Sequence, residues 1–209
     1  MNILLIGPQG SGKGTQARLL VQKYGFFYFE SGDFLRKISE TNEHVKKMLA
    51  EGIFVPDEEM ASYVSSYLDE KGISDNVLFD GFPRSQKQYV VLKSWFGARG
   101  TRIDLVLVLK ISEEETIRRL SARRQDPATG KIYNLITDQP PENINKDTLT
   151  QREDDKPEAI KKRLQWYSDF VMPLVDELKK ETKVVELDGE RSIKEIQNDL
   201  IKEIELLNK

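Results

Sequence analysis

Residues 2–15 read NILLIGPQGSGKGT: a short apolar run leads into a glycine-rich turn and then to a single lysine. The spacing from Gly7 to Lys13 matches the Gly-x-x-x-x-Gly-Lys pattern of a phosphate-binding loop. Backbone N–H groups can wrap a phosphate only where no Cβ atom blocks the approach, and Gly10 and Gly12 give that room. A helix that begins near Lys13 turns its positive dipole end to the same anion. The stretch therefore predicts a buried strand, a phosphate cradle and a helix, in this order.

The position after the lysine departs from the strict motif, because Gly14 stands where Ser or Thr is usual and Thr15 follows it. The sequence thus supports the phosphate cradle more firmly than a hydroxyl contact to magnesium. A structural glycine turn between a strand and a helix is the alternative interpretation. Such a turn does not require a lysine in register after an apolar run, so we favour phosphate binding.

The composition excludes several classes of protein. The 209 residues carry a net charge of −3, which argues against the broad basic surfaces of nucleic-acid or membrane-surface proteins. The chain has no cysteine, so a disulfide framework and a thiolate zinc site are excluded. No apolar run approaches the roughly 20 residues of a membrane span, and no signal-peptide pattern opens the chain. We therefore expect a cytoplasmic globular protein with one sizeable core.

Apolar runs and helical patterns alternate along the rest of the chain. Strands are expected at 2–6, 26–30, 77–80, 104–111 and 183–187. Helices are expected at 13–23, 44–51 (closed by Gly52), 58–70, 86–96, 113–124, 157–180 and 192–207. Alternation of this kind implies an α/β fold of three layers, in which helices cover both faces of a five-stranded parallel sheet.

Two segments interrupt this alternation. Residues 30–55, named the flap, hold short helices that look too polar to add much to the core. Residues 122–155, named the lid, include the long run of turn signals 125–151, which is typical of a lid or a binding loop. The expected core domain then consists of 1–29, 56–121 and 156–209. The single histidine, His44, lies among charged residues of the flap and is given no role.

Charged residues gather after two of the expected core elements. Asp80 ends a buried strand, where α/β sheets place magnesium-side acids, although a helix cap is an alternative. Arg84 follows in a glycine-containing loop, with a surface charge as its alternative. Ser112 and Glu115 predict a capping box for the helix 113–124. Its C-terminal half is crowded by Arg118, Arg119, Arg123 and Arg124. The helix dipole favours cations there but does not require arginine.

Five motifs in the same order resemble the adenylate kinase family. They are the phosphate loop 7–15, SGDFLR at 31–36, DGFPR at 80–84, the pair Arg123-Arg124, and REDD at 152–155. The resemblance covers essentially the whole chain, and the segment 80–84 is its most specific part. It implies a phosphotransferase that moves the γ-phosphoryl group of ATP to AMP, giving two ADP, with Mg²⁺ bound with ATP. A monomer is expected, with ATP, AMP and ADP as its partners and neither nucleic acid nor membrane.

The resemblance also implies which residues hold each nucleotide. The ATP set is Gly10, Ser11, Gly12, Lys13, Gly14, Thr15, Arg119, Arg123, Ile132, Tyr133 and Arg191. The AMP set is Ser31, Arg36, Ile53, Phe54, Val55, Gly81, Phe82, Pro83, Arg84, Gln88, Arg152 and Arg163. Arg119 would stack on the adenine of ATP, and Gln88 is placed to read the adenine edge of AMP.

Elementary chemistry supports this assignment. Two polyanions repel each other more strongly as water leaves, so their transfer site needs cations and careful positioning. The arginine fork can hold two phosphate oxygens at once. The expected catalytic set is Lys13, Arg84, Arg123, Arg152 and Arg163. Asp33 and Asp80 are expected to hold magnesium through water, while the lid and flap close to exclude bulk water.

The chain departs from the family pattern at four positions. Glu30 replaces a common Ser, Ser31 a common Thr, Ala122 a usual Gly, and Asn134 a common His. The lid is long but has none of the ligands of the zinc-bearing variant. We therefore expect Asp126, Tyr133 and Asn134 to stabilise it by hydrogen bonds, with no zinc.

Other functions remain as alternatives. A kinase of the same fold could act on UMP, CMP or GMP, although the long lid and Gln88 argue against it. A nucleotide-dependent switch or motor ATPase needs a water-positioning residue and a second acidic motif. A catalytically inactive nucleotide sensor does not require Lys13 and the arginine set.

Overall fold

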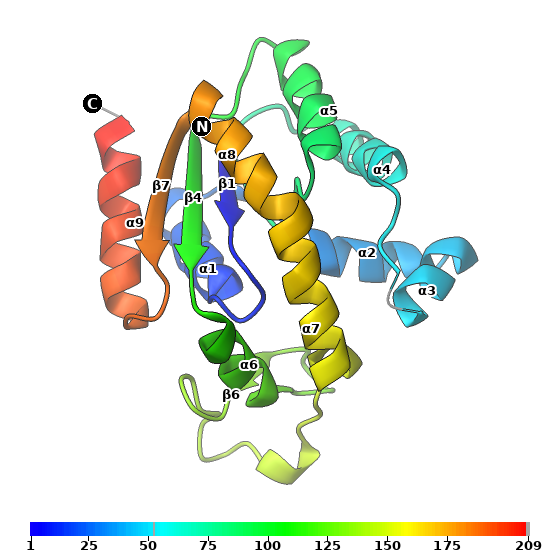
Figure 1. The fold of residues 1–209 in the computed structure, drawn as a ribbon, viewed down its shortest axis with the longest axis vertical. Coiled ribbons are helices and arrows are strands. Elements are labelled where there is room, and N and C mark those ends of the chain that lie inside the picture. The colour runs from blue at the N-terminus through cyan, green and yellow to red at the C-terminus, as the bar shows by residue number, and fades with distance from the viewer. Residues whose placement is uncertain (52, 208–209) are drawn as a thin grey trace.

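The computed structural model describes residues 1–51 and 53–207, so Gly52, expected to close a flap helix, lies outside the described residues. Its centre is a parallel sheet in the order β2-β3-β1-β4-β7, of which Figure 1 shows β1, β4 and β7 side by side. The strands are β1 (Ile3–Ile6), β2 (Phe27–Glu30), β3 (Val77–Asp80), β4 (Leu105–Lys110) and β7 (Lys183–Asp188). The five-stranded parallel sheet expected from the sequence is therefore confirmed.

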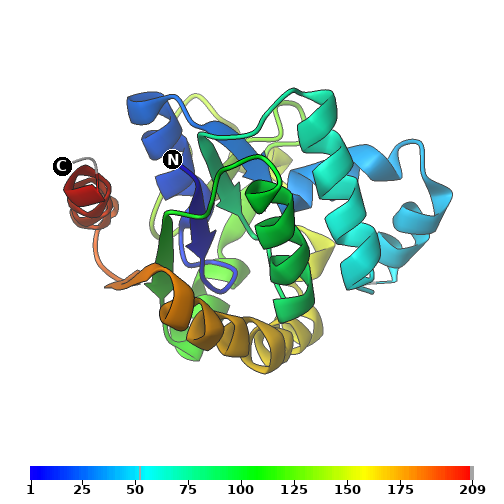
Figure 2. The ribbon, with the colours of Figure 1, turned by 90° about the horizontal axis from the view of Figure 1, so that it is seen from above.

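Helices cover both faces of this sheet (Figure 2). One face packs on α1 (Lys13–Tyr24) and α9 (Ile193–Leu207), and the other on α4 (Asp57–Glu70), α5 (Gln86–Gly97) and α8 (Met172–Glu181). Side chains alternate along a strand, so Ile3 and Leu5 enter one apolar cluster while Leu4 and Ile6 enter the other. This explains the continuous apolar run of β1, which is buried on both sides.

Parallel pairing brings the carboxyl ends of the strands to one edge. Leu5 pairs with Asp80, and Asp80 pairs with Glu30. The phosphate loop follows β1 at this edge, and α1 begins at Lys13 after it. Two carboxylates and the loop are thus brought to one place by strand register alone.

The flap contains α2 (Ser31–Ser39) and α3 (Glu43–Ala50) and adds more to the core than expected. Val45 is 0% exposed, and it belongs with Phe34 to the same apolar cluster as Phe29 of the sheet. The centroids of the Phe29 and Phe34 rings are 5.1 Å apart. The expectation of a flap with little core was wrong, because the polar residues of these helices gather on their exposed faces while a few apolar ones reach the core.

The helix before the lid ends earlier than its sequence pattern suggested. The helix α6 spans Glu113–Ser121, not 113–124, and the chain then forms β5 (Arg123–Gln125) antiparallel to β6 (Ile132–Asn134). Arg123 and Arg124 therefore lie on a strand, because their backbone pairs with that of Asn134 and Tyr133. Two short 3₁₀ turns follow, η1 (Lys146–Thr148) and η2 (Glu153–Asp155).

The long helix expected at 157–180 is divided. The structure has α7 (Pro157–Trp166), a π-helical segment η3 (Tyr167–Val171) and then α8. Pro173 near the start of α8 has no N–H to donate to the preceding turn, and its ring crowds the carbonyl there. The break lies beside the smaller of the pockets described next.

Candidate active site

A cleft of about 710 Å³ opens at the carboxyl edge of the sheet, bordered by the phosphate loop, the flap and the lid. A pocket of about 230 Å³ adjoins it and shares Ser31, Gly81, Arg84 and Trp166 with its wall. The cleft is lined by every residue of the expected ATP set: Gly10, Ser11, Gly12, Lys13, Gly14, Thr15, Arg119, Arg123, Ile132, Tyr133 and Arg191.

The expected AMP residues are divided between the two hollows. Arg36, Pro83, Arg152 and Arg163 line the cleft, Phe54, Val55 and Gln88 line the pocket, and Ser31, Gly81 and Arg84 line both. Ile53 and Phe82 line neither within the described residues. Ile53 is 49% exposed, and Phe82 is buried in the core.

The phosphate loop is held open by glycine conformations. Gly10 and Gly12 have φ of +81° and +89°, in the left-handed region that favours glycine. The first turn of α1 carries no acidic residue, so its positive dipole end is available to an anion. Lys13 Nζ donates to the carbonyl oxygens of Gly7 at 2.7 Å and Pro8 at 2.9 Å. Burial lowers the pKa of Lys13 to about 8, although Asp80 opposes the shift.

Asp80 lies at the floor of the cleft as a buried carboxylate. The Tyr28 hydroxyl donates to its Oδ2 at 3.1 Å. Burial raises the pKa of Asp80, while Lys13 and the Tyr28 hydrogen bond act in the opposite direction. The cost of burying this acid is thus reduced by a cation that also faces the cleft.

Arg84 is fixed at the boundary between the cleft and the pocket. Its Nε donates to Gly81 O at 2.6 Å and its Nη2 to Ser31 Oγ at 2.8 Å. A Cβ atom on Gly81 would lie 2.7 Å from Ser31 Oγ, and the φ of Gly81 is +75°, so only glycine fits. Burial, then Arg163, lowers the pKa of Arg84 to about 10.

Two adjacent acids hold the arginines on the lid side. Arg123 donates to both carboxylate oxygens of Asp155 at 2.7 and 2.5 Å, and Arg163 Nη1 donates to Asp154 Oδ2 at 2.6 Å. Burial opposes ionisation of Asp154, but Arg163 and Arg123 hold its pKa below the ordinary value. Arg152 Nε donates to Gln125 Oε1 at 2.9 Å. Guanidinium groups from β5, α7 and the segment before η2 are therefore gathered at one wall.

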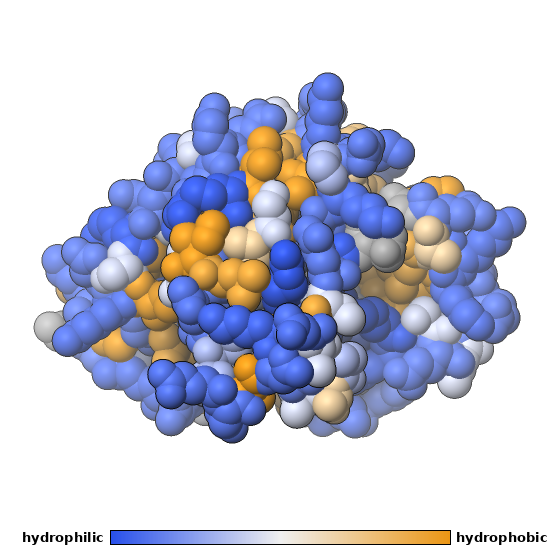
Figure 3. All heavy atoms as spheres, turned by 90° about the horizontal axis from the view of Figure 1, so that it is seen from below, coloured by the Kyte–Doolittle hydropathy of each residue, from blue (hydrophilic) through white to orange (hydrophobic). Residues whose placement is uncertain are grey.

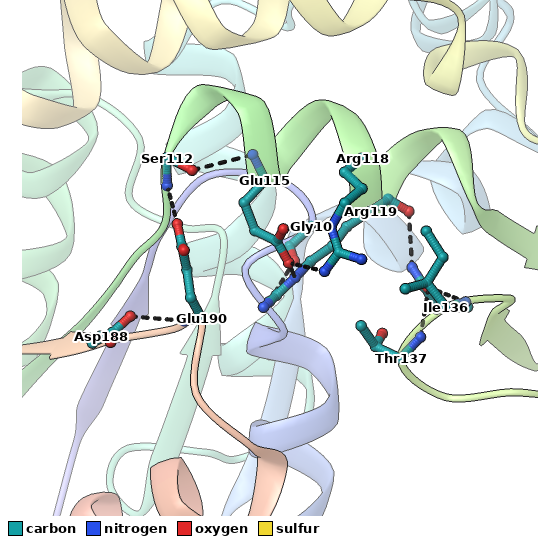
Figure 4. Close-up of polar contacts among 10 residues, drawn as sticks. Gly10, Ser112, Glu115, Arg118, Arg119, Ile136, Thr137, Asp188 and Glu190 are labelled. Atoms are coloured by element: carbon teal, nitrogen blue, oxygen red, sulfur yellow. Dashed lines mark hydrogen bonds and ion pairs between the residues drawn. The ribbon is translucent and has the colours of Figure 1, made fainter.

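Arg119 is positioned by its own helix and by the lid (Figure 4). Its Nε donates to Glu115 Oε1 at 2.5 Å, and its Nη1 to Gly10 O at 3.3 Å. Asn134 Nδ2 donates to the carbonyl of Arg119 at 2.8 Å. Asn134 Oδ1 in turn accepts from the backbone N–H groups of Ile136 and Thr137. The guanidinium is thereby tied to the rim of the phosphate loop.

The capping box of α6 forms only in part. Ser112 Oγ accepts from Glu115 N, as expected, but the Glu115 carboxylate binds Arg118 and Arg119 instead of the Ser112 N–H (Figure 4). Glu190 Oε1 accepts that N–H at 2.8 Å. Two arginines compete for the carboxylate more strongly than a backbone donor, since both partners are charged.

The hydrogen bonds expected to stabilise the lid are present for two residues. Asp126 accepts from Ala128 N and from the Thr129 hydroxyl, and Asn134 makes the contacts given above. Tyr133 is buried instead beneath the Lys131 ammonium, which lies 5.0 Å from its ring centroid.

The flap brings Arg36 to the cleft together with Glu30, an acid that the sequence analysis named as a departure from the family pattern but gave no role in the site. Arg36 Nη2 pairs with Asp33 and lies 3.6 Å from Glu30 Oε1. Burial, then Asp33 and Asp80, raises the pKa of Glu30, which lines the cleft. Asp33 does not line the cleft within the described residues, unlike Asp80. The register of β2 against β3 is the signal that could have found Glu30.

Arg191 lies at the rim of the cleft and pairs with Asp199 at 2.7 Å.

No group of three or more His, Cys, Asp or Glu in the described part of the chain could hold a metal ion. The acids do fit a magnesium ion held through its water ligands, because Asp80 offers a buried oxygen donor in the cleft. Among the described residues, no helix is long and apolar enough to cross a membrane.

A glycine-rich phosphate loop at the edge of a parallel sheet, facing buried lysine and arginine side chains, defines a P-loop phosphotransferase that acts on nucleotides. The comparisons with known proteins make this specific. The family model described as adenylate kinase matches residues 5–183. The chain belongs to the adenylate kinase family, whose reaction is the reversible transfer of the ATP γ-phosphoryl group to AMP, giving two ADP. The family generally uses Mg²⁺ with ATP.

Curated relatives named adenylate kinase match nearly the whole chain. One from Kosmotoga olearia is 34% identical and covers 99% of this chain and 100% of its own. One from Fusobacterium nucleatum is 36% identical and covers 97% of each. A third from Thermococcus onnurineus is 38% identical over 94% of this chain and 90% of its own. The activity is therefore that of an ATP:AMP phosphotransferase.

Proposed function

We propose that ATP occupies the phosphate-loop side of the cleft and AMP the smaller pocket, so that their phosphates meet between Lys13 and Arg84. One observation carries the proposal: the five expected catalytic cations line one continuous cleft. These are Lys13, Arg84, Arg123, Arg152 and Arg163. Repulsion within the cluster is only partly offset by the nearby acids, since Arg84 and Arg163 each lower the pKa of Lys13 while Asp80 raises it. Bound phosphates would remove that repulsion.

On the ATP side, the N–H groups of the loop and the start of α1 would wrap the β- and γ-phosphates. Lys13 would leave the carbonyls of Gly7 and Pro8 and donate to the phosphates instead. Arg119, Ile132 and Tyr133 would wall the base, with Arg191 at the rim. Magnesium neutralises phosphate charge when it is bound with ATP, and Asp80 would hold its water ligands, with Asp33 proposed in the same role.

On the AMP side, Arg84, Arg36 and Ser31 would hold the phosphate, and Gln88 would meet the base. The backbone at 53–55 would close the edge of the pocket, and Phe82 supports Pro83 and Gly81 from the core. An oxygen of the AMP phosphate then attacks the γ-phosphorus, and the bond to the β-phosphate oxygen breaks. Arg123, Arg152 and Arg163 would stabilise the charge on the transferring group.

We also propose that the flap (30–55) and the lid (122–155) move as covers on the core (1–29, 56–121 and 156–209). Their closure would exclude water, which is the competing acceptor of the phosphoryl group. We propose a cytoplasmic monomer that needs only ATP, AMP, ADP and Mg²⁺, without zinc. Both covers contribute cleft residues, since Arg36 comes from the flap and Ile132 from the lid.

The proposal is tested by ADP formation from ATP with AMP, UMP, CMP or GMP as acceptor. We expect AMP to be the preferred acceptor. In Arg84→Ala, the KM for AMP should rise at least about tenfold while the KM for ATP changes little, because a charged hydrogen bond to phosphate is lost. Arg102→Ala, at a side chain that is 87% exposed, is the matched control. Equal weakening of ATP and AMP would refute the assignment of Arg84 to the acceptor side.

A further inference from the structure

The smaller pocket is an apolar slot with one neutral amide in it. The apolar part of its wall comes from Leu35, Phe54, Val55, Met60, Trp166 and Phe170. Gln88 is 4% exposed and lies beside Arg84, which marks the phosphate end. A planar base that enters the slot would therefore meet the Gln88 amide as its neutral polar partner.

The Gln88 amide has only one stable orientation in this structure. Its Oε1 accepts from the Arg84 N–H at 2.8 Å, and its Nε2 donates to Asp57 Oδ1 at 2.9 Å. A backbone N–H can only donate, and a carboxylate can only accept. Rotating the amide by 180° would bring two donors together at Arg84 and two acceptors together at Asp57.

Fixing the amide fixes what it can offer to a ligand. One lone pair remains on Gln88 Oε1 and one hydrogen on Nε2. The adenine edge presents an amino group beside a ring nitrogen acceptor, which matches this pair. The hypoxanthine and guanine edges present a carbonyl beside a ring N–H, the reverse order. A 6-oxopurine in the same place would meet acceptor with acceptor and donor with donor.

We propose that Asp57 is a positioning residue that determines base specificity, because it holds the Gln88 amide in the sense that accepts 6-aminopurine and rejects 6-oxopurine monophosphates. The inference rests on the proposed placing of AMP in the smaller pocket. Asp57 is suited to this by its place at the first residue of α4, where the helix dipole stabilises its charge. It is also half-buried, so water competes less for its carboxylate.

The test compares AMP with inosine monophosphate, which differs only at the 6-position and the adjacent ring nitrogen. The quantity to follow is kcat/KM for AMP divided by kcat/KM for inosine monophosphate. We expect Asp57→Asn and Asp57→Ala to lower this ratio by roughly fivefold to tenfold, the size of one hydrogen bond. The change should lie in the KM for the monophosphate, with the KM for ATP unaltered. Glu58→Gln removes an exposed charge from the same helical turn and should leave the ratio unchanged.

A double-variant cycle shows whether Asp57 acts through Gln88. In a Gln88→Met background, Asp57→Asn should have no further effect on the ratio. An equal effect in both backgrounds would mean that Asp57 reads the base directly, and would overturn the inference. So would an unchanged ratio in Asp57→Asn or Asp57→Ala with normal ATP binding and thermal stability. If the unaltered protein used inosine monophosphate better than AMP, the proposed placing of AMP would fail instead.

Discussion

The flap and the lid border the same cleft but are attached to the molecule by different forces. The flap is anchored by apolar contacts: Val45 is fully buried, and the Phe54 ring stacks on Trp166 of α7 at 4.4 Å between centroids. The lid is held by charge: Arg123 and Asp155 join its two ends, and Asp154 pairs with Arg163 of α7. The end of the molecule that carries the lid shows a largely hydrophilic surface (Figure 3).

This difference sets how each cover responds to its surroundings. Apolar contacts depend little on ionic strength, whereas salt screens a half-exposed pair such as Asp154 with Arg163, in which the Asp154 side chain is 44% exposed. The lid arginines are also the groups that phosphates would attract, so a nucleotide competes directly with Asp154 and Asp155 for them. The flap offers no such competition at its aromatic stack. We expect the lid to respond to salt and phosphate, and the flap to respond to the base.

Breaking the ion pair that joins the two ends of the lid should have the largest effect. Asp155→Asn takes the charge from a side chain that is 0% exposed and leaves Arg123 without its bidentate partner. Asp154 lies 3.9 Å from Arg123 and compensates in part. We expect a loss of about 3 kcal/mol in local stability, the low end for breaking a buried pair. Amide hydrogen exchange of β5 and β6 measures it.

The control for this variant is Asp147→Asn, an exposed acid in η1 of the same lid. Exchange in the flap helices α2 and α3 should not change in either variant. If α2 and α3 were to open together with β5 and β6, the two covers would form one cooperative unit, and the contrast between them would be lost.

Removing the aromatic stack should have an intermediate effect. Phe54→Ala deletes a contact worth about 1 kcal/mol beyond area burial, so the KM for AMP should rise roughly fivefold. The KM for ATP should stay constant. The ratio of the KM for AMP in the variant to that in the unaltered protein should be the same at low and high salt. Leu49→Ala, at an exposed apolar residue of α3, is the control. A salt-dependent loss would contradict an apolar anchor.

The smallest effect is expected from pH, which changes the protonation of Lys13 in the cleft. Burial lowers the pKa of Lys13 to about 8, whereas ATP phosphates favour its charged form. Binding of ATP should therefore be strongest below pH 8 and weaken above it, by roughly fourfold between pH 7 and 8.5. The pKa of Arg84 is about 10, so AMP binding should stay level over the same range. Titration calorimetry of ATP and of AMP at both pH values distinguishes the two sides of the cleft. Equal weakening of ATP and AMP binding would contradict the assignment of Lys13 to the ATP side.

The sheet and the phosphate loop could be predicted because their signals are local. The apolar run of β1 and the glycines after it specify a strand and a turn without reference to distant residues. The end of α6 at Ser121 could not, since Arg123 leaves the helix to pair with Asn134 of the lid. Nor could the choice of partner by Ser112 N, which Glu190 reaches from far along the chain.

The candidate site follows the same division. The sequence motifs indicated which lysine and arginine side chains would meet at the site, and the cleft is lined by them. The roles of Glu30 and Asp57 were missed because they depend on tertiary placement, on strand register for Glu30 and on the approach of α4 to α5 for Asp57. The polar pattern of the flap also hid Val45, since a single apolar residue on a polar helix carries a weak signal.

The position of the two tryptophans gives the molecule a built-in optical readout. Trp95 belongs to α5 and lies under the Arg99 guanidinium, and its indole N–H donates to Asp69. It does not line the cleft or the pocket within the described chain. Trp166 lines the smaller pocket and stacks on Phe54 of the flap. Indole emission shifts with the polarity of its surroundings, so Trp166 would report the seating of the monophosphate in real time. Trp95 would supply a steady internal reference, and no dye would have to be attached to a chain that has no cysteine to carry one.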